Sequence, residues 1–110
     1  MPLIRTGDLP RGENSSIFNG HEHGSQVCFF LSAHRPDTGP SLHRHEYEEI
    51  FIVQEGDVLF TLGDETIEAG PGDIVVVPPG TPHKFVSRGV PHRQISIHPV
   101  PRMKTEWLEA

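Results

Sequence analysis

Hydrophobic residues fall in short runs along the chain, and each run ends near a cluster of glycine, proline or acidic residues. The first run lies within 25–34 and is rich in valine, phenylalanine and leucine, which favour strands. No segment has the periodicity of an amphipathic helix. Regularly spaced short strands are typical of a β-sandwich or a small β-barrel. The later expected strands lie within 42–54, 58–62, 66–68, 74–77, 84–87 and 93–98.

Turn signals divide these runs and indicate how the chain is organised. Gly63-Asp64 is a hairpin pair, and 55–57 is interpreted as another turn. A length of 110 residues suits one domain with one core. We expect an N-terminal arm with a lead-in strand over 1–24, and a barrel with a short C-terminal extension over 25–110. Residues 105–108 are interpreted either as a short helix or as an added strand.

Charge and composition narrow the classes of partner. The net charge of −6 argues against binding to nucleic acid or to anionic membranes, which requires a basic surface. No apolar run approaches the roughly 20 residues that cross a bilayer, and residues 1–10 lack the apolar core of a signal peptide. The single Cys28 excludes an internal disulfide. We therefore expect a cytoplasmic protein.

Histidine is unusually frequent, with eight in the chain, and its placement points to metal binding. In a regular strand, His43, His45, Tyr47 and Glu49 share one face, so two imidazoles and one carboxylate would converge. His83, in a proline-rich turn, is the best fourth ligand. Three nitrogens and one carboxylate suit Fe, Mn, Co, Ni, Cu or Zn ions, whereas Ca²⁺ and Mg²⁺ prefer oxygen ligands. One divalent transition metal per chain is expected.

Two spaced motifs resemble those of the cupin family. His43-x-His45-x3-Glu49-x6-Gly56 matches the first motif, and Gly72-x5-Pro78-x-Gly80-x2-His83 matches the second. The pattern departs from the family at Asp37, where a glycine is usual, and at Ser87, where an asparagine is usual. The resemblance implies an all-β jelly-roll barrel of two antiparallel sheets, with a metal in its mouth held by His43, His45, Glu49 and His83.

His98 and Tyr47 are the candidate catalytic residues. Gln94, Ser96 and His98 alternate with Ile95 and Ile97, and the polar face points either into the barrel or to solvent. Tyr47 either lines the pocket or packs beside it. The other assignments are a solvated loop for His21 and His23, surface positions for His34 and His92, and core positions for Phe51, Phe60 and Phe85.

The expected function is that of a metal-dependent enzyme acting on a small organic substrate. Many cupins are dioxygenases, so the resemblance favours that reaction. A Lewis-acid lyase, isomerase or cyclase is the alternative, and a non-catalytic metabolite-binding or sensing module is a third possibility. Ile50 and Ile52 oppose the ligand face, which predicts that another sheet or a second copy covers them. We expect a homodimer.

Overall fold

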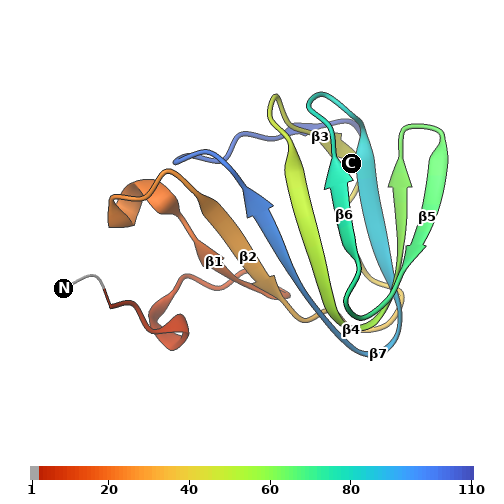
Figure 1. The fold of residues 1–110 in the computed structure, drawn as a ribbon, viewed down its shortest axis with the longest axis horizontal. Helices are drawn as coiled ribbons and strands as arrows, with labels where there is room; N and C mark the ends of the chain where they lie inside the picture. The colour runs from red at the N-terminus through yellow and green to blue at the C-terminus, as the bar shows by residue number, and fades with distance from the viewer. Residues whose placement is uncertain (1–2) are drawn as a thin grey trace.

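β-Strands account for nearly all the regular structure in the computed structural model, which describes residues 3–110 and, at Val90, the backbone alone (Figure 1). The first two residues of the expected arm lie outside the described part of the chain. Two short 3-10 helices, η1 (Thr6–Asp8) and η2 (Gly20–His23), precede the second strand. The strands are β1 (Ser15–Phe18), β2 (Cys28–Ser32), β3 (His43–Arg44), β4 (Glu49–Leu62), β5 (Glu65–Ala69), β6 (Ile74–Val77), β7 (His83–His98) and β8 (Glu106–Trp107).

Two long antiparallel strands, β4 and β7, form the spine of the sheet. One end of this spine is flanked by β2 and β1 on one side and by β6 on the other. The other end is flanked by β3 and β8 on one side and by β5 on the other. Both long strands curve, so the sheet curls around an interior (Figure 1). The predicted all-β fold of two antiparallel sheets is confirmed, with the sheets joined through β4 and β7.

The bend in β4 is a β-bulge, where the sequence predicts a turn at 55–57. Its pairing with β7 shifts register between Val53 and Glu55 and again between Glu55 and Asp57. Gly56 has a φ of 81°, and a Cβ placed there would lie 2.4 Å from the Pro91 carbonyl oxygen. A single strand therefore replaces the two expected ones, because the glycine permits a sharp bend without ending the strand.

Aromatic residues fill the interior of the curled sheet, as expected from the sequence. The ring centroids of Phe51 and Phe60 lie 4.9 Å apart, and Phe85 lies 5.6 Å from Phe51. All three are buried. Aliphatic residues from β4, β5 and β6 complete this core: Val53, Val58, Ala69, Val75 and Val77.

The opposite side of the sheet carries eight apolar residues in two cross-strand rows, which together form the outer apolar face. Phe29, Ile97, Ile50 and Val76 are register partners across β2, β7, β4 and β6, and Leu31, Ile95, Ile52 and Ile74 form the next row. Ile74 is 63% exposed and Val76 is 54% exposed. Every second residue of β6 is thus exposed, although the β-branched run at 74–77 reads as a continuously buried strand.

Both ends of the chain add strands to the sheet. The arm contributes β1, which pairs with β2 from Ser15↔Ser32 to Phe18↔Phe29. The tail forms strand β8 and not a helix, with Trp107 opposite His43 on β3. Within the described residues, no helix combines the length and apolar character that a membrane crossing requires.

Candidate metal centre

Four side chains converge at one end of the curled sheet, on the residues that the two motifs single out. His43 lies on β3, His45 follows that strand, and Glu49 and His83 begin β4 and β7. His43 and His83 are register partners. All four residues are buried, and their potential ligand atoms lie within 4.8 Å of one another. The site is therefore assembled from three separate strand ends.

The local geometry differs from the single straight strand expected over 42–54. In such a strand the six residue steps from His43 to Glu49 would span about 20 Å, too far for a shared ion. Residues 45–48 instead form a bend between β3 and β4. This bend brings Glu49 back toward His43 and His45, so the expected residues meet for a different geometric reason.

Backbone carbonyl groups orient all three ligand imidazoles. The Nδ1 atoms of His43, His45 and His83 lie 2.7, 2.9 and 2.9 Å from the carbonyl oxygens of Ser41, Lys104 and Thr81, respectively. A carbonyl only accepts, so each Nδ1 must carry a proton. Whenever one of these rings is neutral, its lone pair is therefore on Nε2, and a ring that also carries a proton on Nε2 can donate it to Glu49. The Nε2 atoms of His45 and His83 lie 3.0 and 2.9 Å from Glu49 Oε1.

Glu49 is the centre of negative charge in the site. Burial by itself raises the pKa of this carboxyl group, but the surrounding imidazoles of His45, His83 and His98 outweigh it and hold the pKa well below its usual range. Burial lowers the pKa of His45, yet Glu49 and the Lys104 carbonyl bring it above its ordinary value. Glu49 is thus a carboxylate at neutral pH.

His43 is uncharged at neutral pH. Burial lowers its pKa to about 4, and this effect exceeds the opposing one of its bond to the Ser41 carbonyl. A neutral imidazole is the form that binds a metal ion. The His43 ring therefore does not have to lose a proton at neutral pH before an ion binds.

The donor set fits a divalent transition metal. Nε2 of His45 is buried, and although it lies near Glu49 it is not aligned for a hydrogen bond with any described residue. A buried polar atom left in this way is unfavourable unless a ligand satisfies it. Three imidazole nitrogens and one carboxylate are typical of iron, manganese, cobalt, nickel, copper or zinc sites. These four residues would hold such an ion.

The two expected catalytic residues lie beside this cluster. The polar face of β7 points inward, so His98 is buried, with its Nε2 3.1 Å from Glu49 Oε2. The Tyr47 hydroxyl is 2.8 Å from His98 Nδ1, and its ring stacks on His45 at a centroid distance of 5.0 Å. Tyr47 supports both histidines from behind and is not among the described residues that line the adjacent cavity.

A cavity of about 580 Å³ opens onto the cluster. His43, His45 and Glu49 line it together with His98. Most other walls are apolar, and no lysine or arginine of the described chain lines it. The apolar lining includes Ile17, Phe30, Phe51, Phe85, Met103 and Trp107. A ligand in this cavity could reach an ion at the cluster while most of its surface lies against hydrocarbon.

The C-terminal segment contributes more to the site than the sequence indicates. The Lys104 carbonyl orients His45, and the Trp107 ring lies 4.9 Å from the His43 ring. Trp107 pairs with His43 through β8. A backbone carbonyl can come from any residue, so the sequence does not indicate that Lys104 orients His45. Residues 105–108 were predicted only as a short helix or an added strand.

Two histidines expected at the surface lie inside. His92 is only 2% exposed, and the half-buried His34 lines the cavity. His34 follows β2 and His92 lies on β7, and their rings lie 5.1 and 6.5 Å from the Phe85 ring in the interior. His21 and His23 are exposed on η2, in keeping with the expected solvated position.

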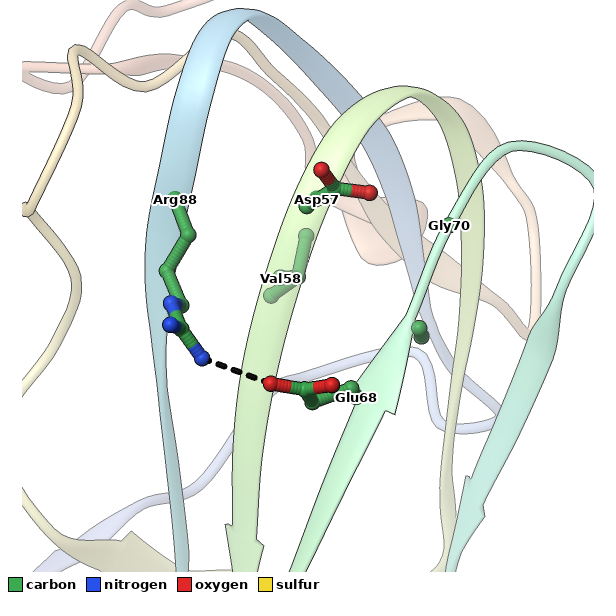
Figure 2. Close-up of a pocket in the computed structure, with 6 residues that line it drawn as sticks. Asp57, Val58, Glu68, Gly70 and Arg88 are labelled. Carbon is green, nitrogen blue, oxygen red and sulfur yellow. Dashed lines mark hydrogen bonds and ion pairs between the residues drawn. The ribbon is translucent and has the colours of Figure 1, made fainter.

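A second hollow, of about 440 Å³, is lined by residues of β4, β5 and β7 (Figure 2). Figure 2 shows Arg88 and Glu68 bridging it, with a nitrogen–oxygen distance of 2.7 Å. Both side chains are more than half exposed. A solvated ion pair of this kind stabilises little and offers no ligand set for a metal.

Comparison with known proteins gives one family. Residues 31–98 match the family model described as the cupin domain. An uncharacterized protein of Methanocaldococcus jannaschii, MJ1618, is 42% identical over 72 residues, which are 62% of this chain and 58% of that protein. The match therefore spans a little over half the length of that relative.

Similar solved structures share the curled sheet at low sequence identity. Oxalate decarboxylase from Bacillus subtilis gives a TM-score of 0.83 at 17% identity, covering 96% of this chain and 31% of that one. A Klebsiella pneumoniae protein with a double-stranded β-helix domain gives 0.73 at 15% identity, covering 100% and 99%. KdgF from Halomonas sp. gives 0.62 at 23% identity, covering 66% of each chain. These likenesses show the fold.

Proposed function

The chain belongs to the cupin family, and from that membership and its metal-suited site we propose that it is a metal-dependent enzyme acting on a small organic substrate. One observation carries the proposal: three of the four residues that would hold the ion, His43, His45 and Glu49, line the cavity. A purely structural metal site is closed to ligands, whereas a catalytic site keeps positions open to them.

The residues of this chain would divide the work. His43, His45, His83 and Glu49 hold the ion, which supplies Lewis acidity and, if it is iron, the capacity to activate dioxygen. His98 lies against the second oxygen of Glu49 and keeps that carboxylate in place. The apolar walls of the cavity exclude water, which strengthens electrostatic interactions at the reacting end.

Dioxygenation is our first proposal for the reaction. The four residues would hold an ion beside the cavity, where a chelating substrate, or a substrate and a co-reactant, could reach it. A substrate with two neighbouring oxygens, such as an enediol, a β-diketone or a catechol, suits such an arrangement. The apolar lining favours substrates whose remaining surface is hydrocarbon.

Lewis-acid chemistry without net oxidation is the second proposal. It is supported by the structural neighbours, because one of them is an oxalate decarboxylase studied for its Mn(II) centres. The sequence identity to that protein is only 17%, so its substrate is not transferred to this chain. In this reaction class the four ligand residues would hold an ion that supplies Lewis acidity, and the neighbouring His98 would hold or move a proton.

Metal analysis followed by oxygen-uptake measurements tests the proposal. The protein is purified without chelator or nickel resin, analysed by mass spectrometry for metals, and loaded with Fe(II), Mn(II) or Zn(II). Each form is then assayed with a panel of enediols, β-diketones and catechols. The His21→Ala variant, which lacks an exposed histidine outside the site, should bind metal and react as the wild type does.

Stoichiometric iron with substrate-dependent oxygen uptake would support dioxygenation. Turnover with manganese or zinc and no oxygen uptake would support the Lewis-acid reaction. No metal after reconstitution would overturn the proposal and leave a non-catalytic binding module as the better description.

A further inference from the structure

The C-terminal segment presents every second side chain to the cavity beside the metal-suited cluster. Met103, Thr105 and Trp107 line the cavity, and the two residues between them, Lys104 and Glu106, are exposed. This alternation is that of an extended chain, in which neighbouring side chains point to opposite sides. The segment therefore forms one wall of the cavity, with an apolar side chain at each end of it.

Contacts on both sides of Trp107 fix this wall against β3. The Arg44 guanidinium donates two hydrogen bonds to the Glu106 carboxylate, at 2.9 and 3.0 Å. The Leu108 backbone N–H donates to the Leu42 carbonyl oxygen at 2.9 Å. A ligand would therefore meet a wall that is already in place, which reduces the entropy that binding costs.

Aromatic rings lie next to the metal-suited cluster on two different elements. The Trp107 ring is 4.9 Å from the His43 ring, and the Phe30 ring, on β2, is 5.4 Å from the His98 ring. Trp107 is 60% exposed although it lines the cavity, so part of its indole is free to contact a ligand. Aromatic pairs are stabilised beyond the area they bury, so an aromatic ligand suits these walls better than an aliphatic one of the same size.

The described lining residues offer no cationic partner to a second acidic group of a ligand. No lysine or arginine is among them. Outside the cluster and its neighbour His98, the only imidazole among these residues is that of His34, whose pKa burial lowers to about 4. The lining acids are Glu49 and the exposed Glu13, which lies 3.9 Å from Arg35. A carboxylate away from the ion would thus lose water without gaining an ion pair.

We propose that Trp107 determines specificity, and that the substrate carries its metal-chelating oxygens on a planar aromatic body that packs against this ring. The substrate has no acidic group beyond those oxygens. This inference rests on the proposed function, since the chelating oxygens would be held at the metal. It goes beyond that function by naming the body of the substrate and the residue that selects it.

Two pairs of catechol probes test the inference on the Zn²⁺-loaded protein, because zinc does not oxidise catechols. The first pair, 3,4-dihydroxybiphenyl and 4-cyclohexylcatechol, compares an aromatic with an aliphatic ring of similar size. In calorimetric titrations we expect the biphenyl to bind about two- to tenfold more tightly, which is what one aromatic contact provides. The second pair, 3,4-dihydroxyphenylacetate and its methyl ester, compares an ionised with a neutral group. The ester should bind at least about tenfold more tightly.

Trp107→Leu should remove the preference for the biphenyl without lowering zinc content, and Trp107→Phe should restore most of it. Leu108→Ala, at a neighbouring residue that does not line the cavity, is the matched control and should keep the preference. Should Trp107→Leu fail to fold or lose zinc, the indole N–H resonance of this single tryptophan serves instead in the wild-type protein. It should shift more with the biphenyl than with the cyclohexyl probe.

The outcomes separate this substrate class from the proposed function. Three results would each overturn the class and leave the metal-dependent function standing: equal or reversed affinities within either pair, a preference for the biphenyl that survives Trp107→Leu, or an unmoved indole resonance. Failure of every probe to bind the zinc-loaded protein, or failure to bind zinc, would overturn both.

Discussion

His43, His45 and His83 each hold one ring nitrogen against a backbone carbonyl group, and this shared feature defines the chemistry of the site at the scale of residues. It selects the tautomer that leaves Nε2 free, and it limits ring rotation. Three such rings around one ionised carboxylate form a preorganised chelating site. Each ligand should therefore contribute strongly to metal affinity.

Substitution of single ligands tests that expectation. His45→Ala or His83→Ala should lower metal affinity at least roughly 100-fold, because each removes one of four donors from a fixed arrangement. Glu49→Ala should weaken binding less, since three imidazoles remain. Metal content after dialysis, with circular dichroism to confirm folding, checks this. Full occupancy in both histidine variants would show that the ligand assignment is wrong.

A pH dependence follows from His34, which lies away from the ligand cluster. Its pKa is about 4 in the folded protein and about 6.5 in the unfolded chain. As the pH falls from 6.5 to 4, the unfolded state gains a proton that the folded state does not, so the stability present above pH 6.5 is lost across this window. His34→Gln should reduce the loss by about 1 kcal/mol, allowing for partial solvent screening.

Urea unfolding of the metal-free protein at pH 7.5 and pH 4.5 measures the effect. The comparison is the drop in unfolding free energy between the two pH values in wild type and in His34→Gln. The carboxylates titrate in both proteins and cancel. Identical drops would contradict the burial of a neutral imidazole at this position.

At the scale of elements, the bulge in β4 determines how the sheet curls. Gly56 bends β4 while keeping it paired with β7 on both sides of the bend. The result is that the first residue of β4, Glu49, and the first residue of β7, His83, face each other at one end of the interior. The site thus depends on a backbone feature remote from it.

Gly56→Ala should destabilise the protein by about 2 kcal/mol or more. The new methyl group would meet the Pro91 carbonyl oxygen at 2.4 Å, in a backbone conformation that disfavours side chains. Gly63→Ala is the matched control, because Gly63 also has a positive φ, of 57°, but open space around it. It should cost about 1 kcal/mol. Equal losses in thermal unfolding would show that crowding at the bulge is unimportant.

The same elements show what the sequence could predict. The strand runs, the Gly63-Asp64 hairpin and the four ligand positions were predictable, because apolar spacing and motif residues are local. The bend at 45–48 and the bulge at Gly56 were not, since alternation assumes a straight strand and a glycine beside acidic residues resembles a turn. The burial of His92 depends on tertiary packing, which its polar and proline neighbours in sequence conceal.

At the scale of the whole molecule, the described part of the chain leaves the outer apolar face uncovered where it crosses β6. Its two in-register rows cross four strands and contain no charged residue. An exposed apolar face of this kind is typical of an interaction surface. A second copy would cover it symmetrically, because the same rows can meet across a two-fold axis.

We therefore predict a homodimer through this face. Light scattering after gel filtration at micromolar concentration should give twice the 12.3 kDa chain mass. The charge-balanced pair Ile74→Lys and Val76→Glu should yield a monomer, because both side chains lie at the exposed edge of the face. Ile67→Lys, on β5, is the control and should remain dimeric. A wild-type monomer under these conditions would refute the prediction.

The pairing of β8 with β3 has an optical consequence. Trp107 is the chain's single tryptophan, and its ring lies 4.9 Å from that of His43. An open-shell ion such as Cu²⁺ held by His43 would quench the indole fluorescence at this range, whereas closed-shell Zn²⁺ would not quench by that route. The molecule thus carries its own light-emitting reporter, which would distinguish ions by their unpaired electrons without any added label.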